Sequence, residues 1–80
     1  MENLKKFDEA AASYAKAAEL AKEDYRKVDA LLGQARSLRL GGKQTEALGV
    51  LRGIISKFGR EVPGEAEAEV RLAEWTRGAN

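Results

Sequence analysis

Apolar residues recur at intervals of three and four along most of the chain, and this spacing places them on one face of an α-helix. The pattern is interrupted at Gly41-Gly42, Gly59 and Pro63, since glycine tolerates the left-handed turn that ends helices and proline fits the first turn of a new one. No segment alternates between apolar and polar residues, as a half-buried strand would. The sequence therefore predicts an all-α fold of four antiparallel helices, stacked as helical hairpins in one domain (1–80). The expected helices cover about residues 4–23, 25–40, 43–58 and 63–77.

Three residue types mark the expected starts of helices. Asn3 and Asp24 can cap the first and the second helix through their side-chain oxygens. Pro63 can open the fourth helix, where its missing N–H costs nothing.

Two glycines and two aromatic residues bear on how the helices pack. Gly49 and Gly53 lie four apart inside the third expected helix, where each costs roughly 1 kcal/mol relative to alanine. We therefore expect a neighbouring helix to pack closely against them. Phe58 and Trp75 are expected in the core, although large aromatic residues also anchor interfaces between proteins.

The residue types that most enzymes need are scarce. Cysteine and histidine are both absent, which removes disulfides, thiol nucleophiles, the usual zinc ligands and acid–base pairs that use imidazole. The carboxylates of Glu65, Glu67 and Glu69 alternate around a helix instead of converging. With 44% hydrophobic and 34% charged residues, the chain suits one folded, non-enzymatic domain without a metal or other cofactor.

No apolar run reaches the roughly 18 residues that a membrane span needs. Met1 is followed by polar residues and not by the apolar core of a signal peptide. We expect a soluble chain with no membrane insertion in these residues. Its compartment stays open.

Charge is unevenly distributed, although the net charge is only +1. Residues 30–60 carry six basic residues and one acidic residue, whereas residues 61–80 carry five acidic and two basic residues. Such polarity can steer a charged partner, or it can reflect adjacent helices that neutralise each other.

The chain aligns on itself with an offset of 37 residues, which places Glu9-Ala10 over Glu46-Ala47. A small, a large and a small or apolar residue follow one another at intervals of four and three. They are Ala10, Tyr14 and Ala17 in the first helix, and Ala47, Leu51 and Ile54 in the third. This pattern resembles the second helix of the tetratricopeptide repeat.

The rest of the chain fits the same resemblance, in the order second, first, second and first helix. Ala35 and Leu38 resemble the small and large residues of the first helix, and Gly42 resembles the glycine between the two helices. Leu72-Ala73 resembles the corresponding pair of an incomplete further repeat. The offset of 37 exceeds the consensus period of about 34.

The resemblance implies a module for protein–protein interaction, because the first helices of such repeats line a concave groove that receives peptides. The groove residues implied here are Asp29, Leu32, Arg36, Arg39, Glu67, Val70, Glu74 and Arg77. We expect a scaffold that binds a peptide or helix of another protein. The alternative, a structural piece of a longer repeat array or a self-associating bundle without its own ligand, stays open.

Arg36 and Arg39 bear on the chemistry of the partner. They lie three apart on one helical face and can hold a carboxylate by charge-assisted hydrogen bonds, so the expected partner is acidic. Alternatively, the two arginines pair with Glu67 and Glu74 across the groove or stay solvated. Nucleic acid is not an expected partner, because no glycine-rich loop, aromatic platform or basic run accompanies them.

The terminal helices lack the neighbours that a repeat array supplies. We expect Phe7, Tyr14, Leu72 and Trp75 to be only partly covered by one chain. A homodimer through the first or the fourth helix would cover them. The polar residues of the first helix are equally compatible with a monomer.

Overall fold

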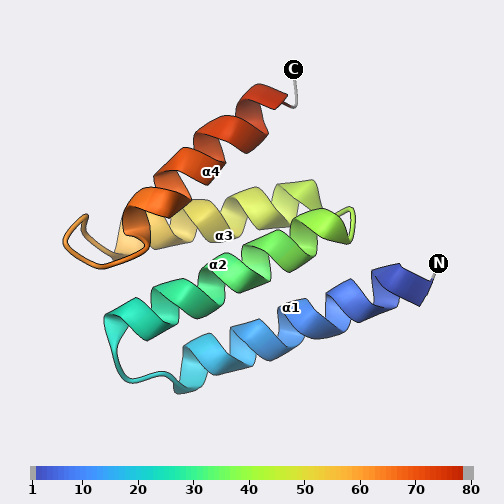
Figure 1. Ribbon diagram of the computed structural model, residues 1–80, viewed down its shortest axis with the longest axis horizontal. Coiled ribbons are helices and arrows are strands. Elements are labelled where there is room, and N and C mark those ends of the chain that lie inside the picture. The colour runs from blue at the N-terminus through green and yellow to red at the C-terminus, as the bar shows by residue number, and fades with distance from the viewer. Residues whose placement is uncertain (1, 79–80) are drawn as a thin grey trace.

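The computed structural model describes residues 2–78, and these residues form four helices joined by loops (Figure 1). The helices are α1 (Glu2–Leu20), α2 (Asp24–Leu40), α3 (Gln44–Lys57) and α4 (Glu65–Gly78). No strand occurs among the described residues, so the predicted all-α fold is confirmed.

Each helix packs against the next one in the chain (Figure 1). Because the chain reverses its direction at every loop, α1 runs parallel to α3 and α2 runs parallel to α4. The Cα atoms span 39 × 32 × 13 Å, so the stacked hairpins form a thin slab with two broad faces. The loop between α2 and α3 is also tied to α1, since Nζ of Lys43 in this loop lies 3.1 Å from Oδ1 of Asp8.

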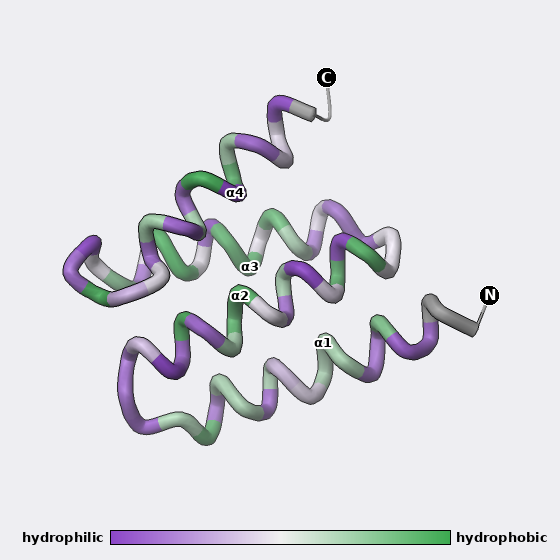
Figure 2. Tube along the Cα trace, in the orientation of Figure 1, coloured by the Kyte–Doolittle hydropathy of each residue, from purple (hydrophilic) through white to green (hydrophobic). Residues whose placement is uncertain are grey.

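The hydrophobic core extends from α1, which contributes Ala11, across α2 and α3 to α4. Val28, Ala35, Ala47, Ile54 and Ala68 are completely buried there. Figure 2 shows strongly apolar residues along α3 and paler, alanine-rich stretches along α1. None of the helices in the described part of the chain has both the length and the apolar character that crossing a membrane requires.

Phe58 and Trp75 are both buried in this core, as predicted. The burial of Trp75 corrects the expectation that it would be only partly covered. Arg39 of α2 lies over its ring, and Gln44 of α3 donates a hydrogen bond to its backbone carbonyl. Tyr14 is 40% exposed, and Phe7 and Leu72 are half-buried, in agreement with their expected partial cover.

Helix boundaries differ from the expected ones by up to three residues. α1 ends at Leu20 and not at residue 23, and it includes Asn3, which therefore does not precede it as a cap. The N-cap position of α2 belongs to Glu23, whose backbone is extended, and Asp24 is the first helical residue. No side-chain hydrogen bond caps this helix, so the predicted cap at Asp24 does not form.

The glycine breaks are partly as predicted. α2 ends at Leu40, and Gly42 adopts a left-handed backbone with φ of +85°. A second left-handed residue, Gly64 with φ of +98°, separates Pro63 from the start of α4 at Glu65. Pro63 therefore lies in the preceding loop and not in the first turn of the helix.

The expectation of close packing at Gly49 and Gly53 is wrong. A Cβ atom built at either glycine meets no other atom within 4 Å. Both residues lie on the outer side of α3, because the core takes Ala47, Leu51 and Ile54 from the opposite side of the helix.

Candidate functional site

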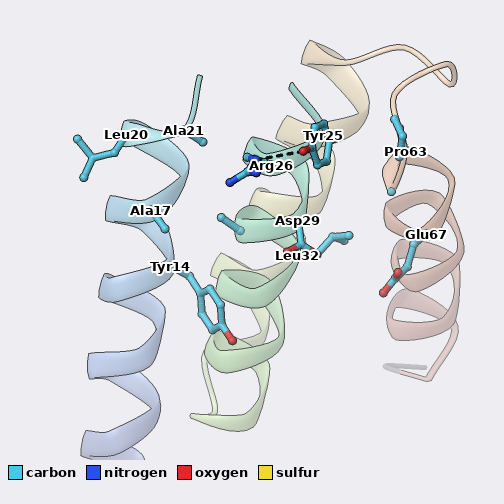
Figure 3. Close-up of a pocket in the computed structure, with 12 residues that line it drawn as sticks. Tyr14, Ala17, Leu20, Ala21, Tyr25, Arg26, Asp29, Leu32, Pro63 and Glu67 are labelled. Atoms are coloured by element: carbon cyan, nitrogen blue, oxygen red, sulfur yellow. Dashed lines mark hydrogen bonds between the residues drawn. The ribbon is translucent and has the colours of Figure 1, made fainter. Parts of the chain in front are cut away.

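A hollow of about 650 Å³ lies over the first half of α2, between the end of α1 and the start of α4. We call it the aromatic hollow, because two exposed tyrosines, Tyr14 and Tyr25, line it. Figure 3 shows α1 on one side, α2 in the middle and α4 on the other side, with Glu67 directed toward the space between them. Its lining also includes Leu20, Arg26, Asp29, Leu32, Pro63 and Gly64.

Tyr14 is held in this hollow by a glycine on the neighbouring helix. Its ring points from α1 toward α2 (Figure 3) and covers Gly33, where a built Cβ would lie 2.5 Å from Cε1 of the ring. Only a residue without a side chain leaves room for the tyrosine there. Beside it, Arg26 Nε donates a hydrogen bond of 3.1 Å to the Tyr25 hydroxyl, which orients the second aromatic ring.

A second hollow of about 420 Å³ lies between the last turns of α2 and α4. We call it the basic hollow, because three arginines and one glutamate supply its charge. Its lining residues are Arg36, Arg39, Leu40, Arg71, Glu74 and Trp75. Arg39 lies over the ring of Trp75, with 4.9 Å from its guanidinium carbon to the ring centre.

Two glutamates engage the arginines of the basic hollow. Arg36 Nη1 lies 3.8 Å from Oε2 of Glu67, and Arg71 Nε lies 3.7 Å from the same oxygen. Arg71 Nη1 also donates a hydrogen bond of 2.9 Å to Oε1 of Glu74. These side chains are about half exposed, and exposed ion pairs contribute only about 0–1 kcal/mol each. A ligand carboxylate can therefore compete for the arginines at low cost.

The Arg36–Glu67 pair stands between the two hollows, since Glu67 lines the aromatic hollow and Arg36 the basic one. The two hollows follow one another along α2, and we call them together the α2–α4 face. One end of this face is aromatic and the other end is basic.

The residues that the sequence predicted for a groove fall on α2 and α4, but they do not form one cluster. Asp29, Leu32 and Glu67 line the aromatic hollow, with Leu32 buried in its floor. Arg36, Arg39 and Glu74 line the basic hollow. Val70 and Arg77 are exposed and line neither hollow.

The alternative pairing across the groove holds for one arginine. Arg36 pairs with Glu67, whereas Arg39 stacks on Trp75 and Glu74 pairs with Arg71. Sequence reasoning missed Tyr25 and Arg71 as lining residues. Arg71 could have been found from its position four residues after Glu67 and three before Glu74, where it bridges both carboxylates.

Residues 29–60, which cover most of α2 and all of α3, match the family model of the tetratricopeptide repeat. The chain carries a tetratricopeptide-like repeat. The matched range contains α2 followed by α3, which is consistent with the predicted order of first and second helix. Tetratricopeptide repeats are typically non-enzymatic and generally mediate contacts between proteins. No curated protein and no solved structure matches the sequence.

Proposed function

We propose that the α2–α4 face binds a segment of another protein, with acidic residues at the basic hollow and an apolar residue in the aromatic hollow. The observation that carries this proposal is the charge of the basic hollow, where three arginines face a single lining glutamate. Guanidinium groups bind carboxylates through two parallel hydrogen bonds, and this geometry favours an acidic side chain or a C-terminal carboxylate.

The aromatic hollow supports the same proposal from the other end of the face. Tyr14 and Tyr25 expose apolar ring surface together with a hydroxyl group, the combination that is enriched where proteins contact one another. A segment that crosses both hollows would therefore gain apolar contact at one end and charge-assisted hydrogen bonds at the other.

The test uses three synthetic peptides of equal length, each with one leucine at its amino end. The first carries four glutamates near its carboxyl end, the second carries glutamines instead, and the third is the glutamate peptide with an amidated terminus. Trp75 is the only tryptophan of the chain and lines the basic hollow, so its fluorescence reports binding. We expect the glutamate peptide to bind most tightly, with an affinity that falls as salt is added. The amidated peptide separates side-chain from terminal carboxylate recognition.

The matched variants are two double substitutions with the same loss of charge. Arg36→Ala with Arg39→Ala removes two arginines of the basic hollow, whereas Arg52→Ala with Lys57→Ala removes two exposed basic residues of α3. We expect the first variant to lose the preference for glutamate and the second to keep it. Equal binding by both variants, or by the glutamate and glutamine peptides, would contradict the proposal.

Self-association is a second candidate, supported by apolar side chains that remain exposed near the end of α1. Tyr14 and Leu20 in α1 and Tyr25 in α2 lie within one region of the surface. A second copy that covers this region would form a homodimer. Sedimentation equilibrium separates the two states, since a monomer has a mass of 8.7 kDa. Substitution of Leu20 by Glu should shift any dimer toward that mass.

A further inference from the structure

A third hollow, of about 680 Å³, lies between α3 and α4. Its apolar lining includes Ile55, Phe58 and Leu72, and its charged lining consists of Arg60, Glu65 and Glu69. We call it the acidic hollow. The residues that α4 supplies here lie on one stripe of the helix, because they follow its three-and-four spacing: Glu65, Glu69, Leu72, Ala73 and Thr76. Arg71 and Glu74, which line the basic hollow, lie on a different stripe.

Glu65 is the unusual residue of this hollow, because it is a carboxyl group with only 2% of its surface exposed. Its Oε1 atom is buried and has no hydrogen-bond partner among the described residues. Buried polar atoms are nearly always paired, because an unpaired one has lost its hydrogen bonds to water without replacing them. The hollow therefore contains a hydrogen-bond acceptor that lacks its donor.

The nearest cation does not supply that donor. Arg60 directs two of its nitrogens to Glu69, with 3.1 Å from Nε to Oε2 and 3.0 Å from Nη2 to Oε1. When it carries a proton, the carboxyl group of Glu65 can donate a hydrogen bond to the carboxylate of Glu69. Burial raises the pKa of Glu65, and the hydrogen bond and the charge of Glu69 raise it further. Arg60 opposes this shift, and the charge of Glu61 in the same loop adds to it.

We propose that the acidic hollow binds a lysine or arginine side chain of a partner protein, whose cationic head pairs with the carboxyl group of Glu65. The stem of such a side chain would lie on Ile55 and Leu72, which are half-buried at the hollow. Charge complementarity favours this occupant, since two carboxylates line the hollow and its one arginine is already engaged. A glutamine or hydroxyl group could also donate, but it would leave the charge of Glu65 unmatched, since Arg60 pairs with Glu69.

Binding of a cation would change the protonation of Glu65. A positive charge next to Oε1 stabilises the carboxylate, so it lowers the pKa that burial raises. The bound state then holds fewer protons than the free state, and affinity increases as pH rises through the pKa of free Glu65. This site does not depend on the function proposed for the α2–α4 face, because the two use different stripes of α4.

The probes are four labelled helical peptides with one alanine-rich sequence, in which a single position between two leucines is lysine, arginine, norleucine or glutamate. Binding is measured by fluorescence anisotropy with the wild-type chain, Glu65→Gln and Glu61→Gln. Glu61 is an exposed residue of the loop before α4, and its substitution by glutamine removes the same charge as Glu65→Gln, so it serves as the control. We expect the lysine and arginine peptides to bind the wild type roughly ten-fold more tightly than the norleucine peptide, the size of one charge-assisted hydrogen bond.

Glu65→Gln should abolish this preference, and Glu61→Gln should retain it. Carbon-detected NMR of the Glu65 carboxyl should show its pKa fall when the lysine peptide is added. Equal binding of the norleucine and lysine peptides, a preference that survives Glu65→Gln, or no binding by any peptide would each overturn the proposal. Self-association that Glu65→Gln abolishes would also overturn it, because the occupant would then be a second copy of the chain.

Discussion

The guanidinium carbon of Arg39 in α2 lies 4.9 Å from the centre of the Trp75 ring in α4. The backbone of Trp75 is also engaged, since Nε2 of Gln44 in α3 donates a hydrogen bond of 3.2 Å to its carbonyl oxygen. One residue of α4 therefore contacts both helices of the matched repeat. This arrangement places an arginine over the only tryptophan of the chain, at the edge of the proposed ligand site.

Substitution of Arg39 by alanine should uncover one face of the Trp75 ring. We expect its fluorescence emission to shift to longer wavelength, because water gains access to the indole. The loss of the cation–π contact should lower the free energy of unfolding by about 0.5–1 kcal/mol. Arg36→Ala is the control, since Arg36 contacts Glu67 at 3.8 Å and not the ring. An equal shift in emission for both variants would show that the effect is not local to Trp75.

The contact between Tyr14 and Gly33 predicts a coupled pair of substitutions. A Cβ added at Gly33 would lie 2.5 Å from the Tyr14 ring, so Gly33→Ala should displace the ring and lose its packing. In a Tyr14→Ala background the same change should gain about 1 kcal/mol, the helix propensity of alanine over glycine. We therefore expect a coupling energy of about 1–2 kcal/mol between the two sites, measured by urea denaturation of a double-mutant cycle.

Gly49→Ala and Gly53→Ala are the controls for this cycle. Both positions lie in open space on α3, so each substitution should raise the free energy of unfolding by up to about 1 kcal/mol. If Gly33→Ala stabilises the wild-type chain as much as these two substitutions do, the ring of Tyr14 does not restrict position 33.

The architecture was predictable because its signals are local. Helical spacing and the breaks at Gly41-Gly42 and Pro63 depend only on neighbours in the chain, and the buried stripe of α3 follows directly from Ala47, Leu51 and Ile54. Which side of a helix remains uncovered is a tertiary property. Gly49 and Gly53 were therefore assigned to the wrong environment.

The candidate sites were less predictable for the same reason. The groove arginines could be placed on one face of α2, but the stacking of Arg39 on Trp75 depends on how far α4 is displaced along α2. Glu65 begins a helix, where an acidic residue is normally solvated and favourable. Its burial results from the packing of the loop and α3 around the start of α4, which the sequence pattern does not encode.

Gly64 is the residue at which a substitution should be most costly to the α3–α4 loop. Its φ of +98° is unfavourable for other residues, and a Cβ there would lie 2.8 Å from Cγ1 of the fully buried Val28. Gly42→Ala is the matched control, because Gly42 has a φ of +85° but open space around it. Gly42→Ala should cost roughly 1–2 kcal/mol for the backbone alone. Gly64→Ala should cost about 1–3 kcal/mol more, because of the added clash. Equal costs in urea denaturation would rule out a clash with Val28.

The two carboxyl groups of the acidic hollow should affect stability in opposite directions as pH changes. Burial is the main cause that raises the pKa of Glu65. The hydrogen bond from Arg60 is the main cause that lowers the pKa of Glu69. The stability that Glu65 contributes to the fold is therefore fully present below the usual carboxyl pKa, and it is lost as pH rises through the raised pKa of Glu65. The stability that Glu69 contributes is fully present above the usual carboxyl pKa, and it is lost as pH falls through the lowered pKa of Glu69.

Glu65→Gln separates the two effects, because the amide keeps the shape of the side chain and a donor for Glu69 but does not ionise. Relative to the wild type, the variant should gain stability as pH rises above the usual carboxyl range, where Glu65 must lose its proton in a buried position. Urea denaturation between about pH 4 and pH 8 measures the difference. Glu61→Gln should change the profile far less, because the charge of Glu61 is the smallest of the causes that raise the pKa of Glu65. A constant difference between wild type and Glu65→Gln across this range would mean that Glu65 titrates as an ordinary exposed carboxyl group. In that case the acidic hollow holds a solvated carboxylate, and its unpaired oxygen does not require a donor from a partner.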